Sequence, residues 1–271
     1  MELTETFKNL STSFPTLRPG HVWLVGAGPG DPGLLTIHAV SAIHQAEVIV
    51  HDSLIDGRIL ALVGSETRLE PAGKRGGQPS TAQSDISLRL VDLARKQNRV
   101  VRLKGGDPFI FGRGGEEAIA LAEAGIPFRV ISGVTAGLAS LVAASIPTTL
   151  RGVNQAVILA TGHGADQPGG PDWQALARTG QPLVLYMAMQ NLDVIAKALM
   201  CGGLAPETPA AVVMWATTED ERIMVSTISH VAAEARAHGF RAPAIVAIGA
   251  IVAARDQLLQ VAADVAEQFV E

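Results

Sequence analysis

The chain has 271 residues, of which 48% are hydrophobic and 4% aromatic, and its formal net charge is −5 at pH 7. This length and apolar content are sufficient for one large or two medium-sized domains. The acidic balance argues against a nucleic-acid-binding protein, because such proteins present a broad basic face.

Cysteine content and hydropathy favour a cytoplasmic protein with no membrane-spanning segment. Cys201 is the only cysteine, which excludes an internal disulfide and any zinc or iron–sulfur site built from several cysteines. Uncharged apolar stretches fall short of the roughly 20 residues that a membrane helix needs. The first 18 residues lack the charged start and apolar core of a secretion signal, so we expect residues 1–20 to be a polar N-terminal extension.

From residue 21 to residue 150, short apolar runs alternate with amphipathic segments. The apolar runs predict strands at 21–25, 48–50, 68–70, 100–103 and 128–131. The segments between and after them predict helices at 34–43, 56–63, 84–96, 116–124 and 135–144. This strand–helix–strand order is typical of βαβ units, so we expect a parallel sheet flanked by helices.

The stretch at 146–154 breaks this alternation, and we place a domain boundary there, giving an N-terminal domain at 21–150 and a C-terminal domain at 151–271. In the second domain the pattern predicts strands at 156–160, 183–187, 211–214, 222–227 and 244–248, with helices at 173–177 and 192–200. A polar pair at 219–220 separates two apolar runs like a hairpin turn, so the second sheet should be mixed. The expected fold class is α/β with two domains.

The first glycine-rich turn, VGAGPGD at 25–31, follows an expected strand and precedes an expected helix. That position is typical of the dinucleotide-binding motif G-x-G-x-x-G. Starting at Gly26, the motif requires glycine at position 31, where this chain has Asp31, and a carboxylate is unfavourable beside a pyrophosphate. Two interpretations remain: Asp31 caps the following helix, or Pro29 packs against a ligand that has no pyrophosphate.

The segment at 100–117, VVRLKGGDPFIFGRGGEE, is the most informative part of the sequence. It contains five glycines, and glycine is costly in backbone entropy unless the chain adopts positive φ or approaches a ligand closely. The segment also carries charge at Lys104, Asp107 and Arg113. Together with the turn at 25–31, it predicts a small-molecule site.

Several segments together resemble one family. They are VGAGPGDPGLLT at 25–36, AGKRGG at 72–77, the segment at 100–117, GVTA at 133–136 and TGH at 161–163. In this order and spacing they are similar to the uroporphyrinogen-III C-methyltransferases, a branch of the tetrapyrrole methylase family. The resemblance runs from about residue 21 to the C-terminus. Its most specific part is LKGGDPFIFGRGGEE, because related branches share the first turn and a GDP turn but not this whole string.

The resemblance implies two α/β domains with S-adenosylmethionine, the methyl donor, folded into the cleft between them; the product is S-adenosylhomocysteine. The implied cofactor contacts are Pro29, Gly105, Gly106, Asp107, Ile110, Thr135, Ala136, Met187 and Ala216. Their chemistry is suitable, because glycines admit a ligand to the backbone and a methionine offers a soft wall for adenine. No metal is expected, since none of the seven histidines has a metal-ligand spacing and a sulfonium is already a good leaving group.

The resemblance assigns Asp52 as proton acceptor and Lys74 as proton donor. Methylating a pyrrole carbon produces a cationic intermediate that must lose a proton, so a carboxylate base is useful. For Asp52 a helix cap or a hydrogen bond to substrate is an alternative, and for Lys74 a solvated surface position. His163, in the TGH segment, is interpreted as a structural group.

Uroporphyrinogen carries eight carboxylates, so an acidic protein must concentrate positive charge locally. We expect substrate binding by Arg75, Lys104, Arg113 and Arg151, which lie in or beside predicted loops. Arginine is well suited to this role because its paired donors match a carboxylate. The chain departs from the family pattern at three positions, Ser132, Trp215 and Pro79, which affects individual contacts.

The resemblance thus implies methylation of uroporphyrinogen III at carbons 2 and 7 to give precorrin-2 in cobalamin or sirohaem biosynthesis. Alternatives are another precorrin methyltransferase, a nucleotide-dependent oxidoreductase and a non-catalytic tetrapyrrole binder. Asp31 argues against the oxidoreductase, while Asp52 and Lys74 argue against loss of catalysis. The resemblance also implies a two-fold homodimer.

Overall fold

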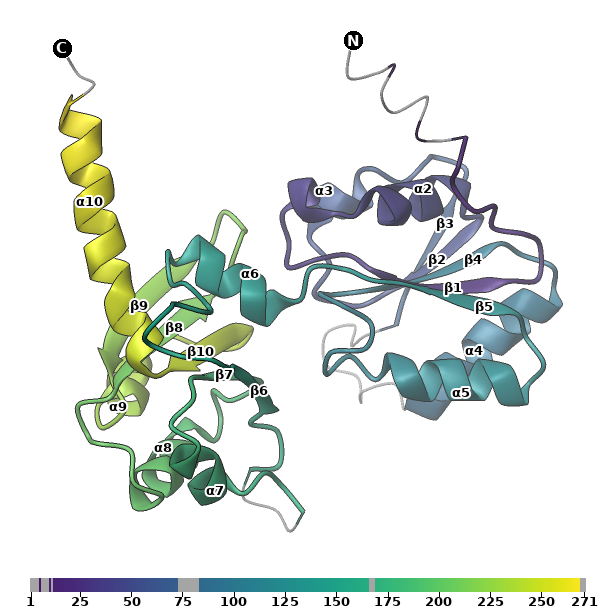
Figure 1. Cartoon of the computed structure of the whole chain (residues 1–271). Helices are drawn as coiled ribbons and strands as arrows, with labels where there is room; N and C mark the ends of the chain where they lie inside the picture. The colour runs from purple at the N-terminus through teal and green to yellow at the C-terminus, as the bar shows by residue number, and fades with distance from the viewer. Residues whose placement is uncertain (1–4, 6–9, 11, 73–82, 166–168, 269–271) are drawn as a thin grey trace. The chain divides into compact units, whose positions relative to one another are not determined.

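The computed structural model describes residues 12–72, 83–165 and 169–268, together with residues 5 and 10 (Figure 1). The chain divides into two compact units, Met1–Thr135 and Ala136–Glu271. Each unit contains one five-stranded sheet flanked by helices, which confirms the predicted α/β class. No helix in the described part of the chain is both long and apolar enough to cross a membrane; the cytoplasmic location stays a prediction.

The first unit is built around a fully parallel sheet. Its strands are β1 (Val22–Gly26), β2 (Val48–His51), β3 (Arg68–Pro71), β4 (Val100–Lys104) and β5 (Phe128–Ile131), in the spatial order β3-β2-β4-β1-β5. Its helices are η1 (Pro32–Leu34), α2 (Ile37–Gln45), α3 (Gly57–Leu60), α4 (Gln83–Arg95) and α5 (Gly114–Glu123). The predicted strand–helix alternation is confirmed throughout this unit.

The two faces of this sheet are covered by different helices. In Figure 1, α2 and α3 lie on one face, and α4 and α5 lie on the other. Strand β4 is buried along its whole length, and its side chains alternate between the two faces. Val101 and Leu103 pack in the core under α2 and α3, whereas Val100 packs in the core under α4 and α5. Arg102 and Lys104 therefore share the α4–α5 face with Val100.

Two N-cap residues lie at and after the end of the first glycine turn, one for each of the next two helices. Asp31 is the N-cap of η1, and its Oδ1 accepts a hydrogen bond of 2.8 Å from the Gly33 N–H. Thr36 is the N-cap of α2 and accepts from the Ala39 N–H at 3.2 Å. The interpretation of Asp31 as a cap is confirmed, and the helix expected at 34–43 is instead a short 3₁₀ turn followed by a separate α-helix.

The second unit has a mixed sheet. Its strands are β6 (Ile158–Thr161), β7 (Leu183–Tyr186), β8 (Pro209–Met214), β9 (Arg222–Thr227) and β10 (Ala244–Ile248), in the order β6-β7-β10-β8-β9. β6 and β7 are parallel, whereas β10 is antiparallel to both of its neighbours and β8 forms an antiparallel pair with β9. The prediction of a mixed sheet with a turn near 219–220 is confirmed.

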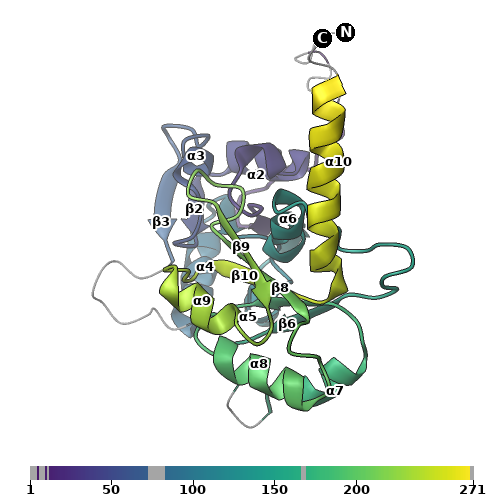
Figure 2. The same ribbon diagram turned by 90° about the vertical axis from the view of Figure 1, so that its left-hand side faces the viewer.

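Helices α7 (Trp173–Arg178), α8 (Leu192–Cys201) and α9 (Val231–Ala237) pack on one face of this sheet, and α6 (Ala136–Ala143) lies on the other (Figure 2). The chain ends with η2 (Ala250–Ala253) and α10 (Ala254–Gln268). The unit begins with α6 rather than at residue 151, because α6 packs against β7 and β10. The Gly137 N–H donates to the Tyr186 Oη at 3.0 Å, which fixes this contact.

Candidate functional site

In the first unit, the predicted site residues gather at one edge of the sheet. The carboxyl ends of parallel strands meet at the same edge, which is where open α/β sheets bind ligands. The segments that leave β1, β2, β4 and β5 at this edge carry Pro29, Asp52, Gly105, Gly106, Asp107, Ile110 and Thr135. The sequence therefore placed these residues correctly relative to the strands.

The glycines at this edge join three loops backbone to backbone. Gly28 and Gly106 exchange two hydrogen bonds, of 3.1 Å and 2.7 Å, and form an isolated antiparallel bridge. A Cβ on Gly26 would lie 2.5 Å from the Gly133 nitrogen, and one on Gly133 would lie 2.2 Å from the Gly106 carbonyl oxygen. Gly106 also has a φ of 66°, so the fold itself requires these glycines.

Asp107 reinforces the same junction. Its Oδ1 accepts from the Phe109 N–H at 2.8 Å, and its Oδ2 accepts from the Gly133 N–H at 3.1 Å. The carboxylate thus connects the loop after β4 to the loop after β5. The sequence predicted a ligand contact for Asp107, and the structure adds this support of the loop.

Two glycines of the central segment differ from the others. Among the described residues, no atom lies within 4 Å of a Cβ built on Gly105 or on Gly115. By contrast, a Cβ on Gly114 would lie 2.3 Å from the Pro108 carbonyl oxygen. Packing within the loop therefore explains the glycine at position 114 but not those at positions 105 and 115. At these two positions, close approach of a ligand is a physical reason for glycine.

Four charged side chains form a network beneath this edge. Arg102 donates from Nη2 to the Asp52 Oδ1 and from Nε to the Glu117 Oε1, the latter at 3.0 Å. The Lys104 Nζ lies 3.1 Å from the Glu117 Oε2. The side chains of Arg102, Lys104 and Glu117 are 2%, 2% and 0% exposed, whereas that of Asp52 is 34% exposed. Asp52 is therefore the member of the network that reaches solvent.

Burial and neighbouring charges act in opposite directions on the two cations. Burial disfavours the charge of Arg102, but Asp52 and Glu117 outweigh it, so the pKa of Arg102 is raised above its ordinary value. Burial lowers the pKa of Lys104, and the adjacent Arg102 guanidinium lowers it further against the opposing effect of the two carboxylates. Lys104 was expected to bind substrate from a loop; it lies instead at the buried end of β4, paired with Glu117.

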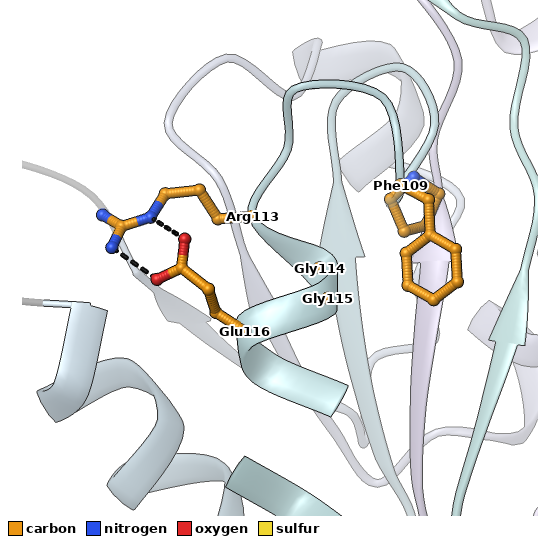
Figure 3. Close-up of a pocket in the computed structure, with 6 residues that line it drawn as sticks. Phe109, Arg113, Gly114, Gly115 and Glu116 are labelled. Atoms are coloured by element: carbon orange, nitrogen blue, oxygen red, sulfur yellow. Dashed lines mark hydrogen bonds and ion pairs between the residues drawn. The ribbon is translucent and has the colours of Figure 1, made fainter. Parts of the chain in front are cut away.

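A shallow cavity of about 430 Å³ lies at the start of α5. Pro108, Phe109, Arg113, Gly114, Gly115 and Glu116 line it (Figure 3). Arg113 is exposed, has a φ of 57°, and donates to both carboxylate oxygens of Glu116 at 2.9 Å and 2.6 Å. This hydrogen bonding lowers the pKa of Glu116 and raises that of Arg113. The cavity therefore offers an aromatic ring, Phe109, and a paired guanidinium.

In the second unit, the predicted residues also follow the carboxyl ends of strands. β7 and β8 both run antiparallel to β10, so their carboxyl ends lie at the same edge. Met187 follows β7 with a φ of 52°, and its side chain is half-exposed. Ala216 follows β8 between Trp215 and Thr217, whose φ values are 51° and 66°. Such left-handed non-glycine residues are uncommon and gather at functional sites.

The remaining sequence-predicted residues are placed as follows. Ala136 begins α6, Arg151 is exposed, and His163 is exposed after β6 with its N–H donating to the Thr161 Oγ1 at 3.2 Å. Ser132 accepts from the Thr36 Oγ1 at 3.3 Å. Lys74, Arg75 and Pro79 lie outside the described residues. Within the described ranges, no three His, Cys, Asp or Glu side chains group as metal ligands; the prediction that the protein needs no metal is untested.

Sequence reasoning missed Arg102 and Glu117. A signal existed, because an arginine inside the otherwise apolar run VVRL must be paired if the strand is buried. The partner was not visible, because Glu117 belongs to the helix that follows the loop.

In both units, loops that follow the carboxyl ends of strands carry the candidate site residues. This arrangement is typical of α/β enzymes that bind small molecules. A family model for tetrapyrrole (corrin/porphyrin) methylases matches residues 21–232. The chain belongs to this family.

Similar proteins and solved structures support the assignment of the chain to this family. The chain is 50% identical over 252 residues to the uroporphyrinogen-III C-methyltransferase of Sinorhizobium sp, covering 92% of this chain and 90% of that one. A siroheme synthase of Aeromonas salmonicida is 43% identical, and the chain spans about half (52%) of its length. A crystal structure of uroporphyrin-III C-methyl transferase from Thermus thermophilus, complexed with S-adenyl homocysteine, has a TM-score of 0.72 and 38% identity, with 86% of this chain and 99% of that chain covered.

A cobalt precorrin-4 methyltransferase structure superimposes with a TM-score of 0.78, covering 86% of this chain and 96% of that one, but its identity is 26%. Its backbone similarity is thus slightly higher than that of the Thermus thermophilus enzyme, while its sequence similarity is lower. The shared fold therefore does not select the substrate within the family; side chains do.

Proposed function

We propose that this protein transfers two methyl groups from S-adenosylmethionine to carbons 2 and 7 of uroporphyrinogen III and so forms precorrin-2. The observation that carries the proposal is the 50% identity, over nearly the whole of both chains, to a relative named uroporphyrinogen-III C-methyltransferase. The 38% identity to a solved enzyme that holds S-adenyl homocysteine supports the choice of methyl donor.

The proposed cofactor site uses the sheet-edge loops described above. The proposed contacts in the first unit are Pro29, Gly105, Gly106, Asp107, Ile110 and Thr135; for the second unit, the resemblance assigns Ala136, Met187 and Ala216. Gly105 is the proposed point of closest backbone approach, because its Cα is open among the described residues. Gly106 and Asp107 hold the loop in shape through their contacts with Gly28 and Gly133.

Asp52 is the proposed proton acceptor. Its carboxylate reaches solvent at the end of β2 while Arg102 fixes it from below. It can therefore remove the proton that the methylated, cationic tetrapyrrole must lose. The assignment of Lys74 as proton donor rests on the resemblance alone.

The proposed substrate-binding cations are Arg75, Arg113 and Arg151. Arg113 and Arg151 are exposed, and a guanidinium that is paired with Glu116 can exchange that partner for a substrate carboxylate of the same geometry. Lys104 is assigned to the support of the site, because its ammonium is buried against Glu117.

The decisive experiment is incubation of the purified protein with uroporphyrinogen III and methyl-labelled S-adenosylmethionine, followed by mass spectrometry. The expected product carries two added methyl groups. Methylation of a precorrin but not of uroporphyrinogen III would indicate another branch of the family, and binding without transfer would indicate a tetrapyrrole binder. A homodimer is also proposed, and light scattering should then give about twice the chain mass of 28.2 kDa.

A further inference from the structure

The buried charge network is larger than a proton acceptor alone requires. Asp52 is held at both carboxylate oxygens: Arg102 donates to Oδ1, and the Gly105 N–H donates to Oδ2 at 3.3 Å. A carboxylate held at both oxygens cannot rotate freely about its Cβ–Cγ bond. Asp52 is thus oriented by a buried side chain and by the loop that follows β4.

Arg102 is itself fixed by several acceptors. Besides Asp52, it donates to the Glu117 Oε1 at 3.0 Å and to the carbonyl oxygens of Leu103 and Val50 at 3.3 Å and 3.4 Å. A planar guanidinium can serve these acceptors together because its five N–H donors have a fixed geometry. Arg102 therefore has little freedom to move, and a group held in this way transmits its position to the partner it contacts.

Glu117 needs support of its own, because an unpaired carboxylate in a fully buried position is strongly unfavourable. Lys104 contributes the second cation at 3.1 Å, and the Gln83 Nε2 donates to Oε1 at 3.0 Å. The four charged groups sum to zero, so the network is balanced while Asp52 keeps its outer side accessible.

We propose that Arg102 is a positioning residue for the methyl-transfer reaction: supported by Glu117 and Lys104, it orients the Asp52 carboxylate toward the substrate. The inference rests on the proposed function, since it gives Arg102 its role through Asp52. In this proposal Arg102 acts through Asp52 and does not itself contact the substrate.

Arg102→Lys tests the proposal, because lysine keeps the charge but cannot reproduce the planar set of donors. A displaced acid–base group loses rate steeply, so we expect turnover to fall by about 10- to 100-fold, while the KM for S-adenosylmethionine stays unchanged. In an Asp52→Asn background the same substitution should cause no further loss, because the group through which Arg102 acts is already absent. Losses that multiply in the double variant would overturn the proposal.

Glu117→Gln is the second variant, since it removes the charge that holds Arg102 and keeps the side-chain size. It should lower turnover in the wild-type background and not in the Asp52→Asn background, whether or not Arg102→Lys folds. Arg89→Met is the control for loss of an arginine that contacts two carboxylates elsewhere in the unit, Glu70 and Asp92, each at 2.8 Å; its side chain is 42% exposed, compared with 2% for Arg102. An equal loss in Arg89→Met would overturn the proposal, as would unchanged turnover in Glu117→Gln.

The outcome for the wild type separates the two hypotheses. If the wild type does not methylate uroporphyrinogen III, the proposed function fails. If the wild type is active but the losses multiply, only the role of Arg102 fails. Thermal unfolding of every variant identifies losses that arise from misfolding.

Discussion

Adjacent glycines 105 and 106 should respond differently to alanine. Gly106 has a φ of 66° and exchanges two backbone hydrogen bonds with Gly28, so its conformation is set by the fold. Gly105 has negative φ, and no described atom lies within 4 Å of its added Cβ. Gly106→Ala should therefore affect stability, and Gly105→Ala should affect ligand binding.

The magnitudes follow from these two environments. Left-handed backbone costs a non-glycine residue about 1–2 kcal/mol, so Gly106→Ala should lower the Tm by about 5 °C. A methyl group forced into a close ligand contact costs about 1–3 kcal/mol, which corresponds to about 5- to 150-fold weaker binding of S-adenosylhomocysteine. For Gly105→Ala the Tm should stay within about 2 °C of the wild type.

Calorimetric titration with S-adenosylhomocysteine and thermal unfolding without ligand measure both effects. Gly57→Ala is the control, because Gly57 begins α3 and its Cβ also meets no described atom within 4 Å. Wild-type affinity in Gly105→Ala would refute the proposed approach of the ligand. A fall in Tm for Gly105→Ala equal to that of Gly106→Ala would refute the distinction between the two positions.

Gly133→Ala should lower the Tm relative to Gly57→Ala, because a Cβ on Gly133 would lie 2.2 Å from a carbonyl oxygen of the neighbouring loop. Such overpacking costs about 1–3 kcal/mol. Equal Tm values for the two variants would contradict the packing argument. The hydrogen bond from Arg89 lowers the pKa of Glu70 below its ordinary 4.5. The Arg89–Glu70 pair should therefore stabilise the folded protein by about 1 kcal/mol or less. This stabilisation should be present above pH 4.5 and disappear as the pH falls through the lowered pKa. Urea unfolding of wild type and Glu70→Gln measures this, and a pH-independent difference would contradict it. Asp52→Asn should reduce single-turnover methylation by about 10²–10⁴-fold with unchanged affinity for S-adenosylhomocysteine; full activity would exclude Asp52 as the base.

The strands were predictable because their burial leaves a pattern in the sequence. The limits of β10 agree with the apolar run at 244–248, which is buried from Ile245 onward, and both sheets have the predicted type. Helix α10 was not predicted, although Leu258, Val261 and Ala262 stand at helical spacing in the sequence; in the structure residues 256–262 are all exposed. Helical spacing of apolar residues therefore does not by itself show whether a helix packs against a core.

The glycines illustrate a different limit. From the sequence, the five glycines at 100–117 indicated either positive φ or close approach of a ligand, without showing which applies to each. The structure separates them, because Gly106 and Gly114 are required by backbone conformation and internal contacts, whereas Gly105 and Gly115 are open. Such a distinction depends on the distance between segments far apart in the chain, which no spacing of residue types encodes.

The specificity of the string beginning at Lys104 has a physical explanation in its contacts. Four consecutive residues bind four different segments: Lys104 pairs with Glu117, Gly105 donates to Asp52, Gly106 bridges to Gly28, and Asp107 accepts from Gly133. A change that breaks one of these contacts therefore alters the geometry of another loop at the same sheet edge. Under the proposed function, the turn that presents its backbone to the cofactor also orients the base, so we expect cofactor binding and proton removal to depend on the same loop contacts.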